Sequence, residues 1–151
     1  MKNVKSLILL LLLSMAIFMT SCNNEVPEEM AIEVVPDEYA VATLDQVDYF
    51  TLNLVKYDTD SVEKLKNEQF VPYTELLPNY KLKKGEVLWL DDMEPGLYAL
   101  SGNVCSSNGS ILGSVKGKSD NMFYSTMQGR NIIIVEEDTP TVIKLVIEFI
   151  H

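Results

Sequence analysis

Apolar and polar residues alternate along much of the chain after residue 40, as expected for strands that bury one face. The alternation is clearest between residues 49 and 55. One face of this predicted strand carries Phe50, Leu52 and Leu54, and the other carries Tyr49, Thr51, Asn53 and Val55.

Two further apolar runs, 87–90 and 97–100, flank the segment Asp91–Gly96, which contains Pro95 and Gly96. Proline and glycine favour turns, so we expect these runs to be neighbouring antiparallel strands. The C-terminus repeats the arrangement: residues 131–135, an acidic turn at 136–140, and a last strand with Lys144 and Glu148 facing water. This pattern predicts a hairpin covered on one side. The inward side chains of its last strand are Ile143, Leu145, Ile147 and Phe149.

Weaker strands are expected at 69–73, 102–105 and 110–115, with the loop 106–109 joining the last two as a hairpin. Residues 60–67 fit a short helical turn with Leu65 inward. Seven or eight short strands in residues 41–151 predict one all-β domain, a single antiparallel β-sandwich of the immunoglobulin-like or prealbumin-like kind.

The first 22 residues differ from the rest. Lys2 and Lys5 precede the apolar run Leu7–Met19, which is shorter than the roughly 20 residues of a membrane-spanning helix and is typical of a cleaved signal peptide. Met19-Thr20-Ser21-Cys22 resembles the loose lipobox of Bacteroidetes lipoproteins. That resemblance implies a signal peptide at 1–21 and Cys22 as the first mature residue, carrying several acyl chains (a palmitate-type anchor). An ordinary secretory signal with an incidental Cys22 is the alternative.

Residues 22–40 are expected to be an acidic flexible tether, because they contain Pro27 and Pro36, many carboxylates and no basic residue. Acidic residues soon after the lipidated cysteine resemble a signal for export to the outer face, and a plain solvated linker is the alternative. Asn23 is not the aspartate associated with retention at the inner membrane. We therefore expect attachment to the cell outer membrane, with a periplasmic or a surface-facing orientation both open.

The net charge of the whole chain is −10, and removal of residues 1–21 leaves 10 basic against 22 acidic side chains. The negative electrostatic field of such a chain repels phosphate groups, so nucleic acid and anionic lipid headgroups are poor partners. The expected membrane contact is the lipid on Cys22.

The sequence contains few residues that could form a catalytic site. The only histidine is His151, at the terminus, so a nucleophile–histidine pair or a usual zinc site is not expected. Asp58-Thr59-Asp60-Ser61 begins like a calcium loop, but Val62 stands where a third ligand would fall. No cofactor and no metal is therefore predicted, and no enzymatic activity.

Cys105 has no disulfide partner once Cys22 is acylated and is expected to be a small buried side chain in a strand. Among the aromatic residues, Trp89 is expected in the core. Tyr80, beside Pro78 in a predicted loop, and Phe123 and Tyr124 are the predicted ligand-binding residues, because exposed flat rings stack on sugars.

The order of Tyr73–Pro78, the strand entry Asp92–Leu100 and the final hairpin 132–150 resembles the uncharacterised Bacteroidetes lipoprotein family DUF4493, with Met122-Phe123-Tyr124 before the last hairpin. The resemblance implies a β-sandwich and transfers no catalytic residue. The expected function is a lipid-anchored accessory binding or structural module of the cell envelope that captures a glycan. The alternative is a fimbrial or adhesion assembly subunit that binds an envelope protein through a sheet edge.

Overall fold

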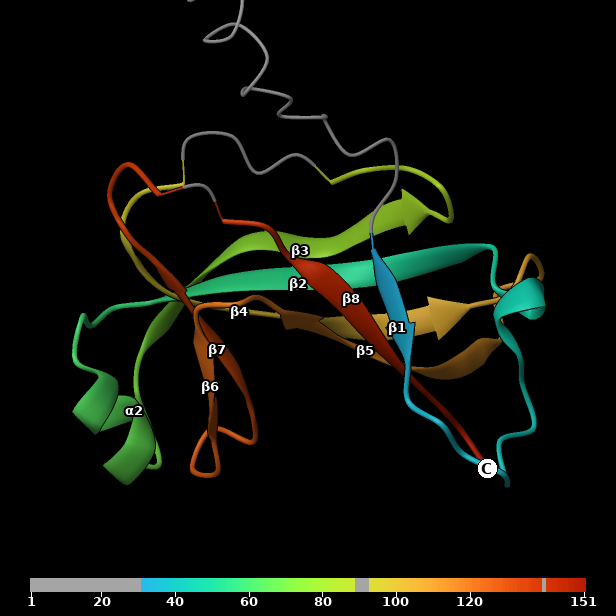
Figure 1. The fold of residues 1–151 in the computed structure, drawn as a ribbon, viewed down its shortest axis with the longest axis horizontal. Coiled ribbons are helices and arrows are strands. Elements are labelled where there is room, and N and C mark those ends of the chain that lie inside the picture. The colour runs from blue at the N-terminus through green and yellow to red at the C-terminus, as the bar shows by residue number, and fades with distance from the viewer. Residues whose placement is uncertain (1–30, 89–92, 140) are drawn as a thin grey trace, which may run out of the picture.

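The computed structural model describes residues 31–88, 93–139 and 141–151. Strands predominate among them, which confirms the all-β fold class (Figure 1). Two short helices, η1 (Leu44–Gln46) and α2 (Val62–Asn67), accompany the strands. The strands are β1 (Ile32–Val34), β2 (Tyr49–Tyr57), β3 (Tyr73–Lys83), β4 (Gly96–Cys105), β5 (Ile111–Lys118), β6 (Met122–Ser125), β7 (Arg130–Val135) and β8 (Lys144–Phe149).

The strands form one hydrogen-bonded sheet that branches at β4. Its main path runs β1-β8-β5-β4-β2-β3, and β7 and β6 extend from β4 in a second direction. The start of β4, residues 96–98, pairs with β7, whereas residues 101–105 pair with β5. One edge of a single long strand therefore serves two branches, which diverge in Figure 1.

Gly117 of β5 lies where the two branches approach each other. A Cβ atom at this position would lie 2.7 Å from Cβ of Leu100 and 3.2 Å from Cδ1 of Ile133. These distances are shorter than van der Waals contact, so a larger residue at this position would push the branches apart.

Apolar side chains inside the curl of the sheet form the larger core, here called cluster 1. Phe50, Leu52 and Leu54, which were predicted to share one face of β2, belong to it, as does the predicted inward face of the last strand, while Lys144 and Glu148 are exposed. The alternation of polar and apolar residues thus grouped the side chains of β2 correctly and identified the inward face of the last strand. Members of cluster 1 include Phe50, Leu52, Leu54, Tyr98, Leu100, Val115, Ile133, Leu145 and Ile147.

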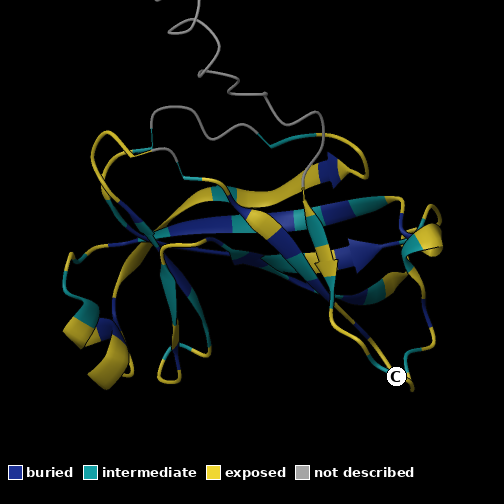
Figure 2. Ribbon diagram, in the orientation of Figure 1, coloured by how far each residue is buried: buried dark blue, intermediate teal, exposed yellow. Residues whose placement is uncertain are grey.

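A second core, cluster 2, covers the opposite face at one end of the sheet. Val55 and Tyr57 lie on the face opposite Phe50 and Leu52, and a register shift separates Leu54 from Val55 in the pairing with β3. Helix α2 covers this end and buries Leu65 completely, as predicted (Figure 2). The members of cluster 2 are Val55, Tyr57, Leu65, Val71, Leu97, Ala99 and Ile132.

The sheet begins earlier than the sequence pattern predicted. Residues 32–34, expected within the acidic tether 22–40, form β1 and pair with β8 in parallel. Ile32 and Val34 pack against cluster 1, and Glu33 points outward to Lys118, with 3.0 Å between Nζ and the carboxylate. The acidic composition concealed this short alternation, and the parallel pair also makes the sheet mixed rather than wholly antiparallel. Residues 1–30, including Cys22, lie outside the described residues.

Several strand predictions need correction. The predicted C-terminal hairpin is wrong, because β8 pairs with β5 and β1 while β7 pairs with β4 and β6. Residues 69–72 are outside any strand, and 97–100 and 102–105 are parts of one strand, β4. Residues 87 and 88 are not in a strand, and the remainder of the predicted strand 87–90, with Trp89, lies outside the described residues. The loop 106–109 joins β4 and β5 as predicted, with Gly109 at φ 85°.

Candidate functional site

The three predicted ligand-binding residues do not form one surface. Tyr80 lies in β3 rather than in a loop, and it pairs with Leu52. Directly paired residues share a face of a sheet, so Tyr80 lies on the face of cluster 1, at its rim, with 40% of its surface exposed. In place of the expected loop, Asn79 lies within the strand with a φ of 51°, and its N–H donates to the side chain of Asn53 at 2.8 Å.

Phe123 and Tyr124 are neighbours in β6 and therefore point to opposite faces. Phe123 pairs with Ile132 and packs, half-buried, against cluster 2, with the ammonium of Lys66 5.3 Å from its ring centroid. Tyr124 faces the other way and is 56% exposed. Three strands, β2, β4 and β7, separate β6 from β3. The arrangement provides no common platform for Tyr80, Phe123 and Tyr124.

A different pair of aromatic residues is exposed beside cluster 2. Phe70 is 85% exposed, and Tyr73 is 48% exposed. Tyr73 pairs with Tyr57 across β2 and β3, and their rings meet edge to face with centroids 6.0 Å apart. The prediction of a strand at 69–73 concealed Phe70. Because residues 69–72 run outside the sheet, Phe70 turns to solvent while Val71 next to it is buried in cluster 2.

Hydrogen bonds from the β6–β7 connection hold the segment that carries Phe70. Ser125, which is fully buried, donates its hydroxyl hydrogen to the carbonyl of Leu65 at the end of α2. Gln128 donates its side-chain amide to the carbonyl of Glu68 at 2.8 Å. The first contact satisfies a carbonyl that a helix end leaves without a partner. Together, the contacts fix the chain two residues before Phe70. We call Phe70 and Tyr73, together with the side chains of Ser125 and Gln128, the aromatic rim.

The aromatic rim is also where the pKa of a buried tyrosine is altered. Burial raises the pKa of the Tyr57 hydroxyl above its ordinary value of 10.0, and the positive charge of Arg130 opposes the rise. The hydroxyl of Tyr57 is therefore protonated at neutral pH, as that of an ordinary tyrosine is.

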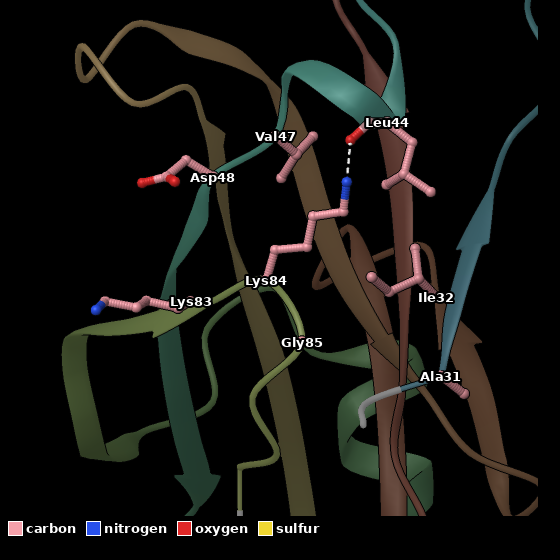
Figure 3. A pocket seen from close by; sticks show the side chains of 8 residues that line it. All are labelled: Ala31, Ile32, Leu44, Val47, Asp48, Lys83, Lys84 and Gly85. Atoms are coloured by element: carbon pink, nitrogen blue, oxygen red, sulfur yellow. Dashed lines mark hydrogen bonds between the residues drawn. The ribbon is translucent and has the colours of Figure 1, made fainter. Parts of the chain in front are cut away.

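A cavity of about 900 Å³ opens at another part of the domain, beneath β1 (Figure 3). No pattern in the sequence predicts this cavity, since its walls come from three separate segments of the chain. The ammonium of Lys84 reaches into it but donates to the carbonyl of Leu44 at 2.7 Å, and Figure 3 shows Lys83 and Asp48 pointing away from Leu44. The cavity therefore offers apolar and polar surface in similar shares. Its lining residues are Ala31, Ile32, Leu44, Val47, Asp48, Lys83, Lys84 and Gly85.

Strand β3 is a long edge strand. Its 11 residues pair with β2 on one side, and no described strand pairs with the other side. Pro78 lacks an N–H group, Asn79 has a left-handed backbone, and Lys81 and Lys83 carry charge. Each of these features discourages the addition of a further strand.

The other candidate residues have ordinary structural environments. Cys105 is a buried free thiol at the end of β4, as predicted. Asp58 accepts a hydrogen bond from the hydroxyl of Thr74, and His151 lies 3.2 Å from a carboxylate oxygen of Asp37. Within the described ranges, His, Cys, Asp and Glu side chains do not gather in threes as a metal site would require. No helix in the described part of the chain combines the length and apolar character needed to span a bilayer.

Comparison with known proteins found no matching family model, no similar curated sequence and no similar solved structure.

Proposed function

We propose that this protein is a lipid-anchored, non-enzymatic module of the bacterial cell envelope that captures a glycan through the aromatic rim. The observation that carries the proposal is the exposure of Phe70 and Tyr73 at one end of the domain. Exposed aromatic rings are costly to leave in water, and their flat faces suit the apolar face of a sugar ring. The hydrogen bonds from Ser125 and Gln128 add rigidity, which lowers the entropic cost of binding.

Attachment to the outer membrane through Cys22 is part of the same proposal. Several acyl chains on one cysteine give lasting attachment, because each buried methylene contributes about 0.8 kcal/mol. The acidic residues that precede β1 would then hold the domain away from the membrane surface, with the aromatic rim available to soluble glycans.

The test uses the full chain extracted in detergent and assayed for binding to a series of immobilised polysaccharides, both neutral and acidic. Phe70→Ala and Tyr73→Ala are expected to weaken binding about fivefold or more, since an aromatic contact contributes about 1 kcal/mol beyond its buried area. Tyr124→Ala is the matched control, an exposed tyrosine on the other face of β6, and should retain full affinity. If Tyr124→Ala or Tyr80→Ala abolishes binding while Phe70→Ala does not, the ligand sits elsewhere and the aromatic rim is not the site.

One observation favours a second candidate function, the docking of an envelope protein on the edge of β3. Residues 73–77 precede Pro78 and carry no lysine, so this half of the edge is less protected than the half with Lys81 and Lys83. A partner strand would gain main-chain hydrogen bonds there. This candidate predicts that Leu76→Pro abolishes co-purification of a partner and leaves polysaccharide binding intact, whereas the glycan proposal predicts no partner whose capture depends on Leu76.

A further inference from the structure

Arg130 is the only arginine of the chain, and its pairing with Ser125 places it beside the aromatic rim. It begins β7 and pairs with Ser125 of β6, whose hydroxyl is buried against Leu65. Side chains alternate along a strand, so Arg130 shares a face with Ile132, which is completely buried in cluster 2. Arg130 itself is half-buried. The guanidinium therefore stands at the boundary between cluster 2 and solvent.

Tyr57 and Tyr73 lie on the same face of the sheet as Arg130. Tyr57 is buried in cluster 2 and close enough to Arg130 for the positive charge to influence its pKa. Tyr73 pairs with Tyr57 and is the more exposed of the two. A cation and an exposed ring thus lie on one face of the sheet, with the buried ring of Tyr57 on a strand between them.

No carboxylate of the described residues forms an ion pair with Arg130. Lys56, Lys116 and Lys118 each have such a partner, at 2.7, 3.4 and 3.0 Å. Glu75 is exposed on the same side of β3 as Tyr73, yet it too forms no ion pair with Arg130 within the described part of the chain. Removal of a guanidinium from water is costly without a counter-charge, and its planar fork fits a carboxylate through two parallel hydrogen bonds.

We propose that the aromatic rim binds an acidic sugar, with Arg130 holding the carboxylate of a uronic acid while Tyr73 and Phe70 contact the sugar ring. This inference rests on the proposed glycan capture and narrows the ligand to one chemical class. The mature chain is strongly acidic, so general attraction does not explain binding of a polyanion, and affinity must come from a local cation.

The experiment compares polygalacturonate with its methyl ester, which has the same sugar backbone without the charge, using the full chain in detergent at about 0.15 M salt. We expect the parent protein to bind polygalacturonate about tenfold to a hundredfold more tightly than the ester, as expected for a charge-assisted bidentate contact. Arg130→Gln should remove this preference. Arg130→Lys keeps the charge but not the planar fork and should retain part of the preference. Lys144→Gln removes one exposed positive charge on β8 and should change nothing.

Equal affinity for the acid and the ester would overturn the role of Arg130 and leave glycan capture standing. The same conclusion follows if Arg130→Gln folds with a normal thermal transition and keeps the preference for the acid. Because the two ligands are compared on the unaltered protein, the inference remains falsifiable even if Arg130→Gln does not fold. Absence of binding to every polysaccharide, acidic or neutral, overturns both this inference and the proposed function.

Discussion

Replacement of Ser125 by alanine tests whether the β6–β7 connection holds the aromatic rim in place. The Ser125 hydroxyl donates to the carbonyl of Leu65 and accepts from the backbone N–H of Gln128 at 3.1 Å. Alanine removes one oxygen atom and leaves almost no cavity, so the loss of these two hydrogen bonds accounts for the effect.

The magnitude follows from the two groups left without a partner. The carbonyl of Leu65 is in a buried contact at the end of α2, and an unpartnered buried acceptor costs about 1–2 kcal/mol. The N–H of Gln128 is part-buried and can partly reach water, so its loss costs about 0.5–1 kcal/mol. We therefore expect the free energy of unfolding to fall by about 2 kcal/mol, and the melting temperature by about 8 °C.

Urea unfolding followed by circular dichroism measures the global effect, and hydrogen exchange of residues 62–72 measures the local one. Exchange should accelerate in α2 and the following segment while cluster 1 keeps its protection. Ser107→Ala, in the exposed loop between β4 and β5, is the matched control and should stay within about 0.5 kcal/mol of the parent. An unchanged stability for Ser125→Ala, or equal acceleration across the whole sheet, would show that this contact does not anchor the rim.

Three further results are expected. Gly102→Ala should prevent folding or lower the free energy of unfolding in urea by several kcal/mol, because the added Cβ would lie 1.8 Å from a backbone oxygen of β2. Gly129→Ala, with φ +64° and open space around it, should lower it by only about 1–2 kcal/mol, and equal effects of the two substitutions would contradict this reasoning. The hydrogen bond from Lys56 lowers the pKa of Glu94 below 4.5, so an NMR titration should place the midpoint of Glu94 below that value, and Lys56→Met should raise the midpoint again. The stability that this contact contributes is present above the unfolded-state pKa of Glu94 and is lost as pH falls through its folded-state pKa. Cys22→Ala should abolish palmitate incorporation, and a mutant that is still labelled would refute lipidation at that residue.

Local sequence patterns were sufficient to predict burial where it depends only on the strand or helix that carries the residue. Alternation identified the residues that share a face of β2 and the inward side chains of β8, and the sequence Ser106–Gly109 identified the turn between β4 and β5. Leu65 was identified as the inward residue of α2 for the same reason. These features follow from the side-chain periodicity of strands and helices, which neighbouring residues determine.

The same patterns do not predict which strands pair with one another. The alternation of β7 and of β8 fits any sheet that covers one face, so it could not reveal that β8 crosses to β5 and receives β1 on its other side. The aromatic rim was missed for a related reason. The sequence pattern places Phe70 and Tyr73 in one short strand, and no local pattern connects Tyr73 with Arg130, which lies 57 positions further along the chain.

The sequence by itself determined an all-β chain, the inward faces of its clearest strands, a strongly acidic character and an N-terminal segment with the pattern of a lipoprotein signal. The tertiary structure alone decided how β4 divides one sheet into two branches, which brings Tyr57, Tyr73 and Arg130 to one rim and separates Tyr80 from Tyr124. The physical reason is that alternation specifies which face of a strand is buried, whereas strand order and the meeting of side chains depend on long-range pairing that no local pattern encodes.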